Sequence, residues 1–137
     1  MTWTLNNVTF TTDMIEDNQG FVYCITDLAN NKKYIGKKNF YSKRTLKALK
    51  GQKRKRKQIK ESDWQDYYGS SAKVNALLLE QGPEIFKREI LHLCKTKGEM
   101  SYIEAREQFE REVLLSDDYY NGIISCRVNQ NHIKNLK

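Results

Sequence analysis

Two short runs of strand-forming residues near the start of this chain constrain its fold more than any other feature. The first run covers residues 21–25 (FVYCI), and the second is Tyr34-Ile35-Gly36. Between them, Asn30-Asn31 supplies a turn, because asparagine tolerates the left-handed backbone that hairpin turns require. We therefore predict strands over residues 21–27 and 33–37, paired as an antiparallel hairpin.

Hydrophobic periodicity in the rest of the chain predicts a small α+β domain. Apolar and polar residues alternate weakly over residues 1–19, as in a short edge strand or hairpin. We assign Trp64 to the core and leave the roles of Tyr68 and Ser70 undecided between structure and binding. We expect the following further elements: a cationic helix over 41–60, an aromatic loop over 64–71, a helix over 72–81 capped by Ser70 or Ser71 with Val74, Leu77 and Leu78 on one face, a strand over 85–94, and a helix over 99–115 that buries Tyr102, Ala105, Phe109 and Val113. The expected fold is a single domain over residues 1–137, in which helices flank a small antiparallel three-stranded sheet.

Positive charge is concentrated in one stretch of the chain. Residues 32–60 hold 14 of the 24 lysines and arginines and none of the 17 acidic residues, so the rest of the chain carries ten bases and all of the acids. Segregated positive charge is typical of a surface that contacts a phosphate backbone. We therefore predict nucleic-acid binding, with a solvated charge run or a membrane-surface patch as the alternatives.

Several other protein classes fit this composition poorly. No apolar run approaches the roughly 20 residues that span a bilayer, and the first ten residues lack the features of a signal peptide. The three cysteines are an odd number at wide spacings, which argues against a disulfide framework. His92, Cys94, Cys126 and His132 show no spacing typical of a zinc site. We expect a cytoplasmic protein with no membrane partner.

Hydrolysis of a phosphodiester needs an activated water and positive charge on the developing phosphorane, and a divalent ion usually supplies much of that charge. Tyr23 and Tyr34 lie on adjacent predicted strands and can face the same side. Glu104 and Glu107 are one turn apart on the last predicted helix. Taken singly, strand tyrosines usually pack in a core, and helix glutamates usually form a solvated face, so both interpretations stay open.

Four elements in order resemble the GIY-YIG nuclease family. Phe21-Val22-Tyr23 stands where the family has its first motif, and Tyr34-Ile35-Gly36 matches the second. Arg44 lies eight residues beyond Gly36, and Tyr120-Asn121 matches the closing pair. The resemblance covers roughly residues 20–125. It departs from the family pattern in its first motif, which reads FVY. The metal-binding glutamate is also ambiguous, because Glu104, Glu107 and Glu112 all lie on the same predicted helix.

The resemblance implies a metal-dependent DNA endonuclease of the phage or homing type that uses Mg²⁺, with Mn²⁺ as a substitute. Its implied catalytic residues are Tyr23, Tyr34, Arg44, Glu104 and Asn121. Glu104 would bind the metal, and Glu107 is the substitute ligand. A tyrosine of ordinary pKa, about 10, is a poor base at neutral pH. The mechanism therefore predicts that the metal and cations such as Lys37 lower the tyrosine pKa.

The implied partner is double-stranded DNA. Nine basic residues are predicted to contact it: Lys37, Lys38, Lys43, Lys47, Lys53, Arg54, Lys55, Arg56 and Lys57. One alternative is a non-catalytic, basic nucleic-acid-binding protein on the same scaffold, and another is a basic regulator that contacts an acidic protein surface. Dimerisation is left open as a source of specificity. The compact form resembles stand-alone phage-encoded members, for which the setting is the cytoplasm of a bacterial host.

Overall fold

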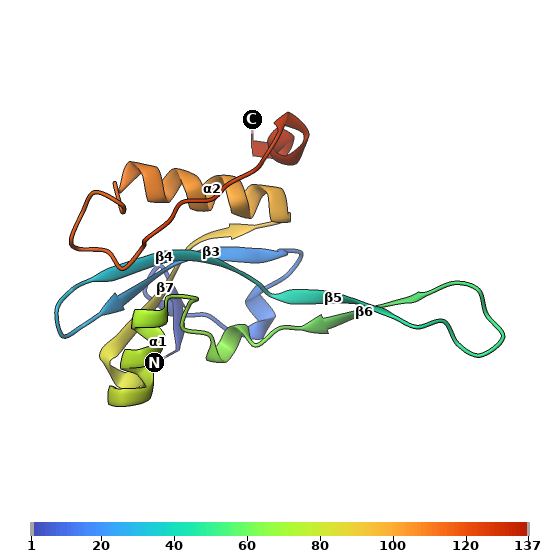
Figure 1. Cartoon of the computed structure of the whole chain (residues 1–137), viewed down its shortest axis with the longest axis horizontal. Helices are drawn as coiled ribbons and strands as arrows, with labels where there is room; N and C mark the ends of the chain where they lie inside the picture. Colours follow the sequence, from blue (N-terminus) through green and yellow to red (C-terminus); the bar gives the residue numbers. More distant parts are fainter. Residues whose placement is uncertain (1, 137) are drawn as a thin grey trace.

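The computed structural model describes residues 2–136, apart from the side chain of Arg44. It is an α+β fold, as predicted, with a layer on each face of a central sheet (Figure 1). The sheet has five strands in the order β2-β1-β7-β3-β4. The strand bounds are Trp3–Leu5 for β1, Val8–Thr9 for β2, Gly20–Asp27 for β3, Lys33–Asn39 for β4 and Phe86–Cys94 for β7.

The central strand β3 explains why the hairpin pattern dominates the sequence. All eight of its residues are buried, and it pairs antiparallel with β4 on one side and β7 on the other. Phe21, Tyr23 and Ile25 enter one hydrophobic cluster, whereas Val22 and Cys24 enter a second cluster on the opposite face. The predicted antiparallel three-stranded sheet is therefore only the centre of the real sheet. The N-terminal strand β1 extends it by pairing parallel with β7, so the sheet is mixed.

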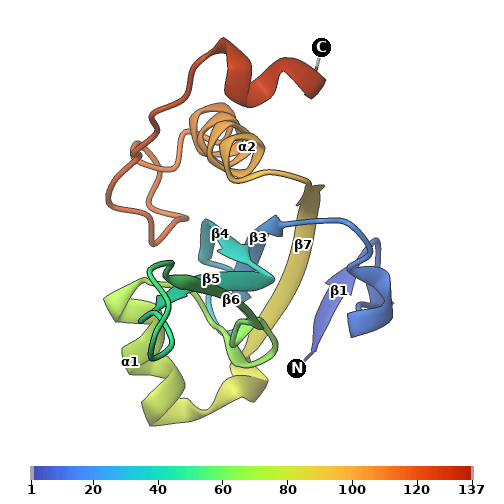
Figure 2. The same ribbon diagram turned by 90° about the vertical axis from the view of Figure 1, so that its right-hand side faces the viewer.

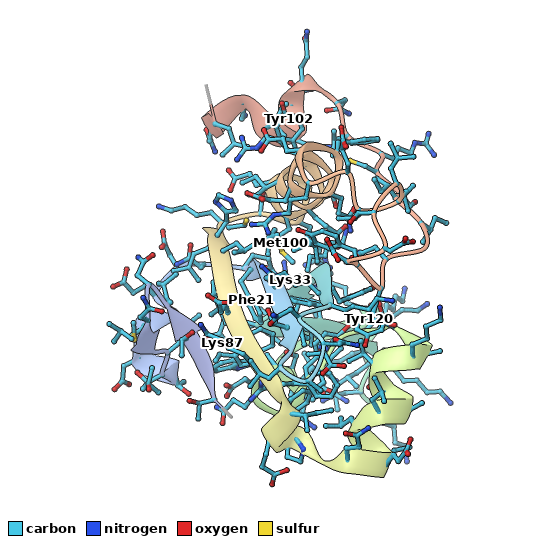
Figure 3. The ribbon with its side chains drawn as sticks, turned by 90° about the vertical axis from the view of Figure 1, so that its left-hand side faces the viewer. Phe21, Lys33, Lys87, Met100, Tyr102 and Tyr120 are labelled. Atoms are coloured by element: carbon cyan, nitrogen blue, oxygen red, sulfur yellow. The ribbon has the colours of Figure 1, made fainter. Side chains whose placement is uncertain are left out.

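Two helices cover the two faces of the sheet (Figure 2). Helix α1 (Ala72–Gln81) has the predicted bounds, begins after Ser71, whose side chain accepts a hydrogen bond from the amide of Val74, and ends at Gly82. Helix α2 (Lys97–Glu110) ends before the predicted residue 115. The prediction that Phe109 is buried is wrong, because its side chain is 65% exposed. Met100 lies between α2 and the sheet instead (Figure 3).

The predicted cationic helix over 41–60 is wrong. The chain forms two antiparallel strands there, β5 (Tyr41–Leu46) and β6 (Arg56–Glu61), which make a separate two-stranded sheet. This hairpin projects away from the rest of the molecule (Figure 1). The segment offers few apolar residues, so no helix face could be buried against the core, and a helix gains most of its stability from such a face. We call residues 41–61 the basic arm.

Short 3₁₀ turns complete the fold at Thr12–Met14, Trp64–Asp66, Pro83–Ile85 and Gln130–Leu136. The turn at Trp64 closes the base of the basic arm. Trp64 is buried, as predicted, and its ring meets that of Phe40, the residue between β4 and β5, with 5.2 Å between centroids. The arm is therefore attached to the core by two buried aromatic residues.

The outer edge of β4 is covered over its first half by the chain after α2. The amide of Lys33 donates to the carbonyl of Asp118 (2.9 Å), and the amide of Tyr120 donates to the carbonyl of Lys33 (2.7 Å). Lys33 and Tyr120, which are distant in sequence, are both labelled in Figure 3. None of the helices within residues 2–136 has the length and apolar character of a membrane-spanning segment.

Candidate active site at the edge of strand β4

The two tyrosines of the motif lie on the same face of the sheet. Tyr23 on β3 is in register with Gly36 on β4, and Tyr34 is in register with Ile25. The two rings lie with their centroids 6.3 Å apart. A Cβ atom on Gly36 would collide with the phenol of Tyr23. The motif therefore requires glycine at this position because the Tyr23 ring crosses directly over the β4 backbone.

The loop before α1 closes over these rings. The hydroxyl of Tyr34 shares a hydrogen bond with Ser70 Oγ at 2.8 Å. Gly69, with a φ of +90°, lies against both Tyr23 and Tyr34, where a larger residue would be strained. The Tyr67 ring meets the edge of Tyr23 at 6.0 Å between centroids. Sequence reasoning missed Tyr67 and Gly69, although the aromatic pair followed by Gly-Ser-Ser at a helix start is a usable signal.

Burial keeps both phenols of the motif protonated at neutral pH in the metal-free protein. Burial raises the pKa of Tyr23 well above its usual value, and the Tyr67 and Tyr34 groups add to the rise. Burial also raises the pKa of Tyr34, although its hydrogen bond with Ser70 acts in the opposite direction. The predicted lowering by Lys37 is therefore absent in the protein itself. Both phenols are hydrogen-bond donors in this state.

Glu104 approaches the site from α2, on the other face of the sheet. The chain after α2 covers only the first half of the outer edge of β4, so groups from the two faces can meet around its second half. The charge of Glu104 contributes to the raised pKa of both Tyr23 and Tyr34. Burial raises the pKa of Glu104 itself, and the nearby charge of Lys37 acts to lower it. Lys37 is exposed, and its Nζ donates to Ser101 Oγ at 2.7 Å, which places this lysine beside α2.

Glu107, the substitute ligand, is already engaged. Its Oε1 lies 2.8 Å from His92 Nε2, and its Oε2 accepts a hydrogen bond from Arg111 Nε at 2.9 Å. Burial acts to raise the pKa of Glu107, but these two hydrogen bonds outweigh it, so the pKa lies below its usual value. Within the described part of the chain, no hydrogen bond or ion pair engages Glu104. The carboxylate that is open to a ligand is Glu104.

The side chain of Asn121 is hydrogen-bonded to the backbone of β4. Its Oδ1 accepts from the amide of Ile35 at 3.0 Å, and its Nδ2 donates to the carbonyl of the same residue at 2.8 Å. Gln108 donates to that carbonyl as well, at 3.1 Å. Asn121 is buried, with both ends of its amide engaged. In the structure, this predicted catalytic residue positions the strand that carries Tyr34 and Gly36.

The predicted phosphate-binding residues divide between the core and the basic arm. Lys38 is held at the core, because its Nζ pairs with Asp63 at 2.6 Å and lies 4.1 Å from the centroid of the Tyr67 ring. The arm and its connecting segment carry exposed cations: Lys43, Lys47, Lys53, Arg54, Lys55, Arg56 and Lys57. The backbone of Arg44 pairs with Gln58 in the arm, and its side chain lies outside the described part of the structure.

The residues at the edge of β4 fit a hard divalent cation. The described residues contain no cluster of three or more His, Cys, Asp or Glu, so a soft-metal cage is not built here. Mg²⁺ needs only one or two protein carboxylates, because water and substrate phosphate complete its shell. Glu104, half-buried and without a hydrogen-bond or ion-pair partner among the described residues, is a carboxylate that could serve as such a ligand. A cavity of about 440 Å³ lies elsewhere against Trp3, Thr9 and Arg88, and none of the predicted site residues line it.

The hairpin with its crossing tyrosine, the glycine beneath it and the free glutamate across the strand edge are the features of a GIY-YIG nuclease site. The comparison with family models agrees. Residues 3–124 match the family described as "Putative endonuclease segE, GIY-YIG domain", and the chain belongs to this family. Searches of curated proteins and of solved structures found no significant match. The family is one of endonucleases, which act on DNA and generally use divalent metal ions.

Proposed function

We propose that this protein is a Mg²⁺-dependent endonuclease of the phage or homing type that hydrolyses phosphodiester bonds of double-stranded DNA. The observation that carries the proposal concerns Glu104, which is half-buried and has no hydrogen-bond or ion-pair partner within the described residues. Its charge acts on the neutral phenols of Tyr23 and Tyr34 at the same strand edge. Membership of an endonuclease family supports the reaction class. The cytoplasm of a bacterial host is part of the same proposal.

Each side chain has a role that follows from its state. Both phenols have raised pKa values, which makes them poor proton acceptors. The half-buried Tyr34 orients the attacking water or a phosphate oxygen through hydrogen bonds, and Tyr23, which is buried, packs beside it. Lys37 is a cation beside Glu104 and favours an approaching phosphate. Arg44 remains the predicted stabiliser of the charge that develops on the phosphate.

Glu104 would hold the divalent ion. When bound, such an ion polarises a phosphoryl oxygen and lowers the pKa of coordinated water. The desolvation that raises the pKa of the free carboxyl favours an added cation at the same place, because a nearby positive charge stabilises the ionised form. Mn²⁺, which accepts similar oxygen ligands, is expected to substitute.

Plasmid cleavage measured with Mg²⁺ and with EDTA tests the proposal directly. We expect nicked or linear product with Mg²⁺ or Mn²⁺ and none with EDTA. Glu104→Gln should lower the rate by about 1,000-fold, in the range expected for a group that acts on developing charge. Glu110→Gln is the matched control, because Glu110 lies on the same helix and is exposed.

Two results would contradict the proposal. Cleavage that continues in EDTA would remove the metal from the mechanism. A folded wild-type protein that binds DNA but never cleaves it would favour the alternative, a non-catalytic nucleic-acid-binding protein on the same scaffold.

A further inference from the structure

We propose that the basic arm is a β-ribbon that enters the major groove of duplex DNA and contacts the base edges, rather than a clamp that touches only phosphates. The inference rests on the proposed function for its substrate class, but it concerns binding and not cleavage. It starts from the shape of the arm. Strands β5 and β6 pair in register from Tyr41 opposite Glu61 to Leu46 opposite Arg56.

The dimensions of such a ribbon match one groove. Two paired strands lie about 4.8 Å apart, and six residues extend for about 20 Å. The major groove of B-DNA, about 12 Å wide, admits a two-stranded ribbon with its side chains, whereas the minor groove, about 6 Å wide, does not. The arm projects beyond the sheet, so a duplex can reach it without moving the core (Figure 1).

The charge of the arm is complementary to a groove walled by phosphates. Residues 41–60 hold ten lysines and arginines and no acidic residue. The one acidic residue of the arm, Glu61 at its base, accepts a hydrogen bond from Trp64 Nε1 at 2.7 Å. Residues opposite each other in an antiparallel pair project to the same face. Lys43 and Lys57 therefore project to one face of the ribbon, and Lys60 and Arg56 project to the other. A ribbon that is cationic on both faces suits a site with phosphates on both sides, whereas a one-sided clamp needs only one cationic face.

One face of the ribbon also carries side chains that can distinguish between DNA bases. Ile59 lies opposite Lys43, and it is 65% exposed on a strand whose six residues are all exposed. Thr45 lies opposite Lys57 on the same face. Lysine donates to guanine O6 and N7, threonine bonds to either kind of base, and an apolar side chain contacts the thymine methyl group, which is present only in the major groove. The face of Lys43, Thr45, Lys57 and Ile59 is therefore assigned to the base edges.

A free two-stranded hairpin is marginally stable in water, so an exposed one needs a binding partner to fix its geometry. Trp64 and Phe40 fix the base of the arm, and both of its faces are left for that partner. Duplex DNA has both the negative charge that complements the arm and a groove wide enough to admit it. A single strand has no groove, and an acidic protein surface has no requirement for both faces.

The experiment measures binding by fluorescence anisotropy with the full-length Glu104→Gln variant in EDTA, so cleavage plays no part. The probe is a labelled duplex of about two helical turns, roughly 21 bp. Methyl green, which occupies the major groove, should displace the protein, and the minor-groove ligand netropsin should not. The corresponding single strand should bind at least about tenfold more weakly. Displacement by netropsin alone, or equal affinity for the single strand, would overturn the proposal.

Two pairs of variants locate the contact. Ile59→Ser changes no charge, and it should weaken duplex binding about fivefold through lost apolar contact. Val8→Ser is its control, because Val8 is 59% exposed on a different strand. Lys43→Ala with Lys57→Ala should weaken binding about tenfold, compared with about threefold or less for Lys97→Ala with Lys134→Ala, exposed lysines outside the arm. An Ile59→Ser variant that binds like Val8→Ser would reduce the arm to a phosphate clamp and overturn the groove assignment.

This outcome is separable from the proposed activity. A protein that cleaves with Mg²⁺ but is displaced only by netropsin retains the nuclease function and loses the groove assignment. A protein that is displaced by methyl green but never cleaves retains the groove assignment and loses the nuclease function.

Discussion

Two antiparallel hairpins follow one another in this chain, with only Phe40 between them. The first, β3–β4, lies in the sheet, with β3 buried on both faces, and Asn121 closes its outer edge. The second, β5–β6, has an exposed second strand and projects from the core. Catalytic groups must be held in fixed positions, whereas a binding surface must be accessible. The buried first hairpin suits the catalytic tyrosines of the proposed function, and the exposed second hairpin suits the proposed contact with DNA. Substitutions should therefore affect stability very differently in each.

Gly36→Ala should give the largest loss of stability. The added Cβ collides with the buried Tyr23 phenol, which has no room to move, so the free energy of unfolding should fall by about 3 kcal/mol. Urea denaturation followed by circular dichroism measures this. Gly122→Ala is the control, because a Cβ there meets nothing within 4 Å. Equal stabilities for the two variants would show that Tyr23 does not lie against β4.

Asn121→Ala should cost about 2 kcal/mol, because the buried amide of Ile35 loses its partner. The carbonyl of Ile35 keeps the hydrogen bond from Gln108, which limits the loss. The same denaturation experiment, together with the cleavage rate, separates two roles for this residue. Activity that recovers when Asn121→Ala is stabilised by low temperature or osmolyte identifies a positioning residue, and activity that stays absent identifies a catalytic one.

The two glutamates of α2 should respond to pH in opposite directions. The pKa of Glu107 is lowered in the folded protein, so its stabilisation is present above the unfolded pKa and is lost as pH falls through the folded pKa. Glu107→Gln should therefore destabilise the fold by about 1 kcal/mol at pH 7 and by less in acid. Thermal unfolding measured from pH 7 down to pH 3 tests this.

The pKa of Glu104 is raised instead, so its ionised form destabilises the metal-free fold above that pKa, and the penalty disappears below the unfolded pKa. Glu104→Gln should be more stable than wild type at pH 7 without metal, and equal to it in acid. Added Mg²⁺ should raise the melting temperature of the wild type but not of Glu104→Gln. A wild type that gains nothing from Mg²⁺ would argue against Glu104 as its ligand.

The smallest effect on stability is expected in the basic arm. Replacing Lys53, Arg54, Lys55, Arg56 and Lys57 with alanine should change the free energy of unfolding by less than about 0.5 kcal/mol, because these side chains are exposed. The same change should flatten the salt dependence of DNA binding, by about 0.9 in the slope of log K against log salt for each lost phosphate contact. A slope equal to that of the wild type would remove these residues from the DNA interface.

The elements that were predicted correctly are those whose buried positions recur at a regular spacing in the sequence. The strands around Tyr23 and Tyr34, and the helix over 72–81, were predicted almost to the residue, because apolar positions and caps mark them. The basic arm was predicted as a helix because its pairing is non-local and its exposed positions leave no apolar period. Phe109 fits a helical stripe in the sequence, but the structure leaves it exposed.

The residues of the candidate site divide in the same way, into those that a local sequence pattern marks and those that depend on contacts between distant elements. Tyr23, Tyr34 and Gly36 belong to one local motif and were found together. The hydrogen bonds that occupy Glu107 could be seen only in the structure, because they come from His92 on β7 and from Arg111 just beyond α2. Spacing along a helix cannot show which of two neighbouring carboxylates another element has already neutralised.

The attachment of the basic arm also bears on how such a protein can diversify. The arm leaves the core at Phe40 and returns at Trp64, and these two rings are in contact. A loop whose ends meet can change in length or sequence at little entropic cost to the domain that carries it. The residues between these two aromatics, Arg44 apart, therefore form a segment that can vary in length and sequence while the hairpin that carries Tyr23 and Tyr34 stays as it is.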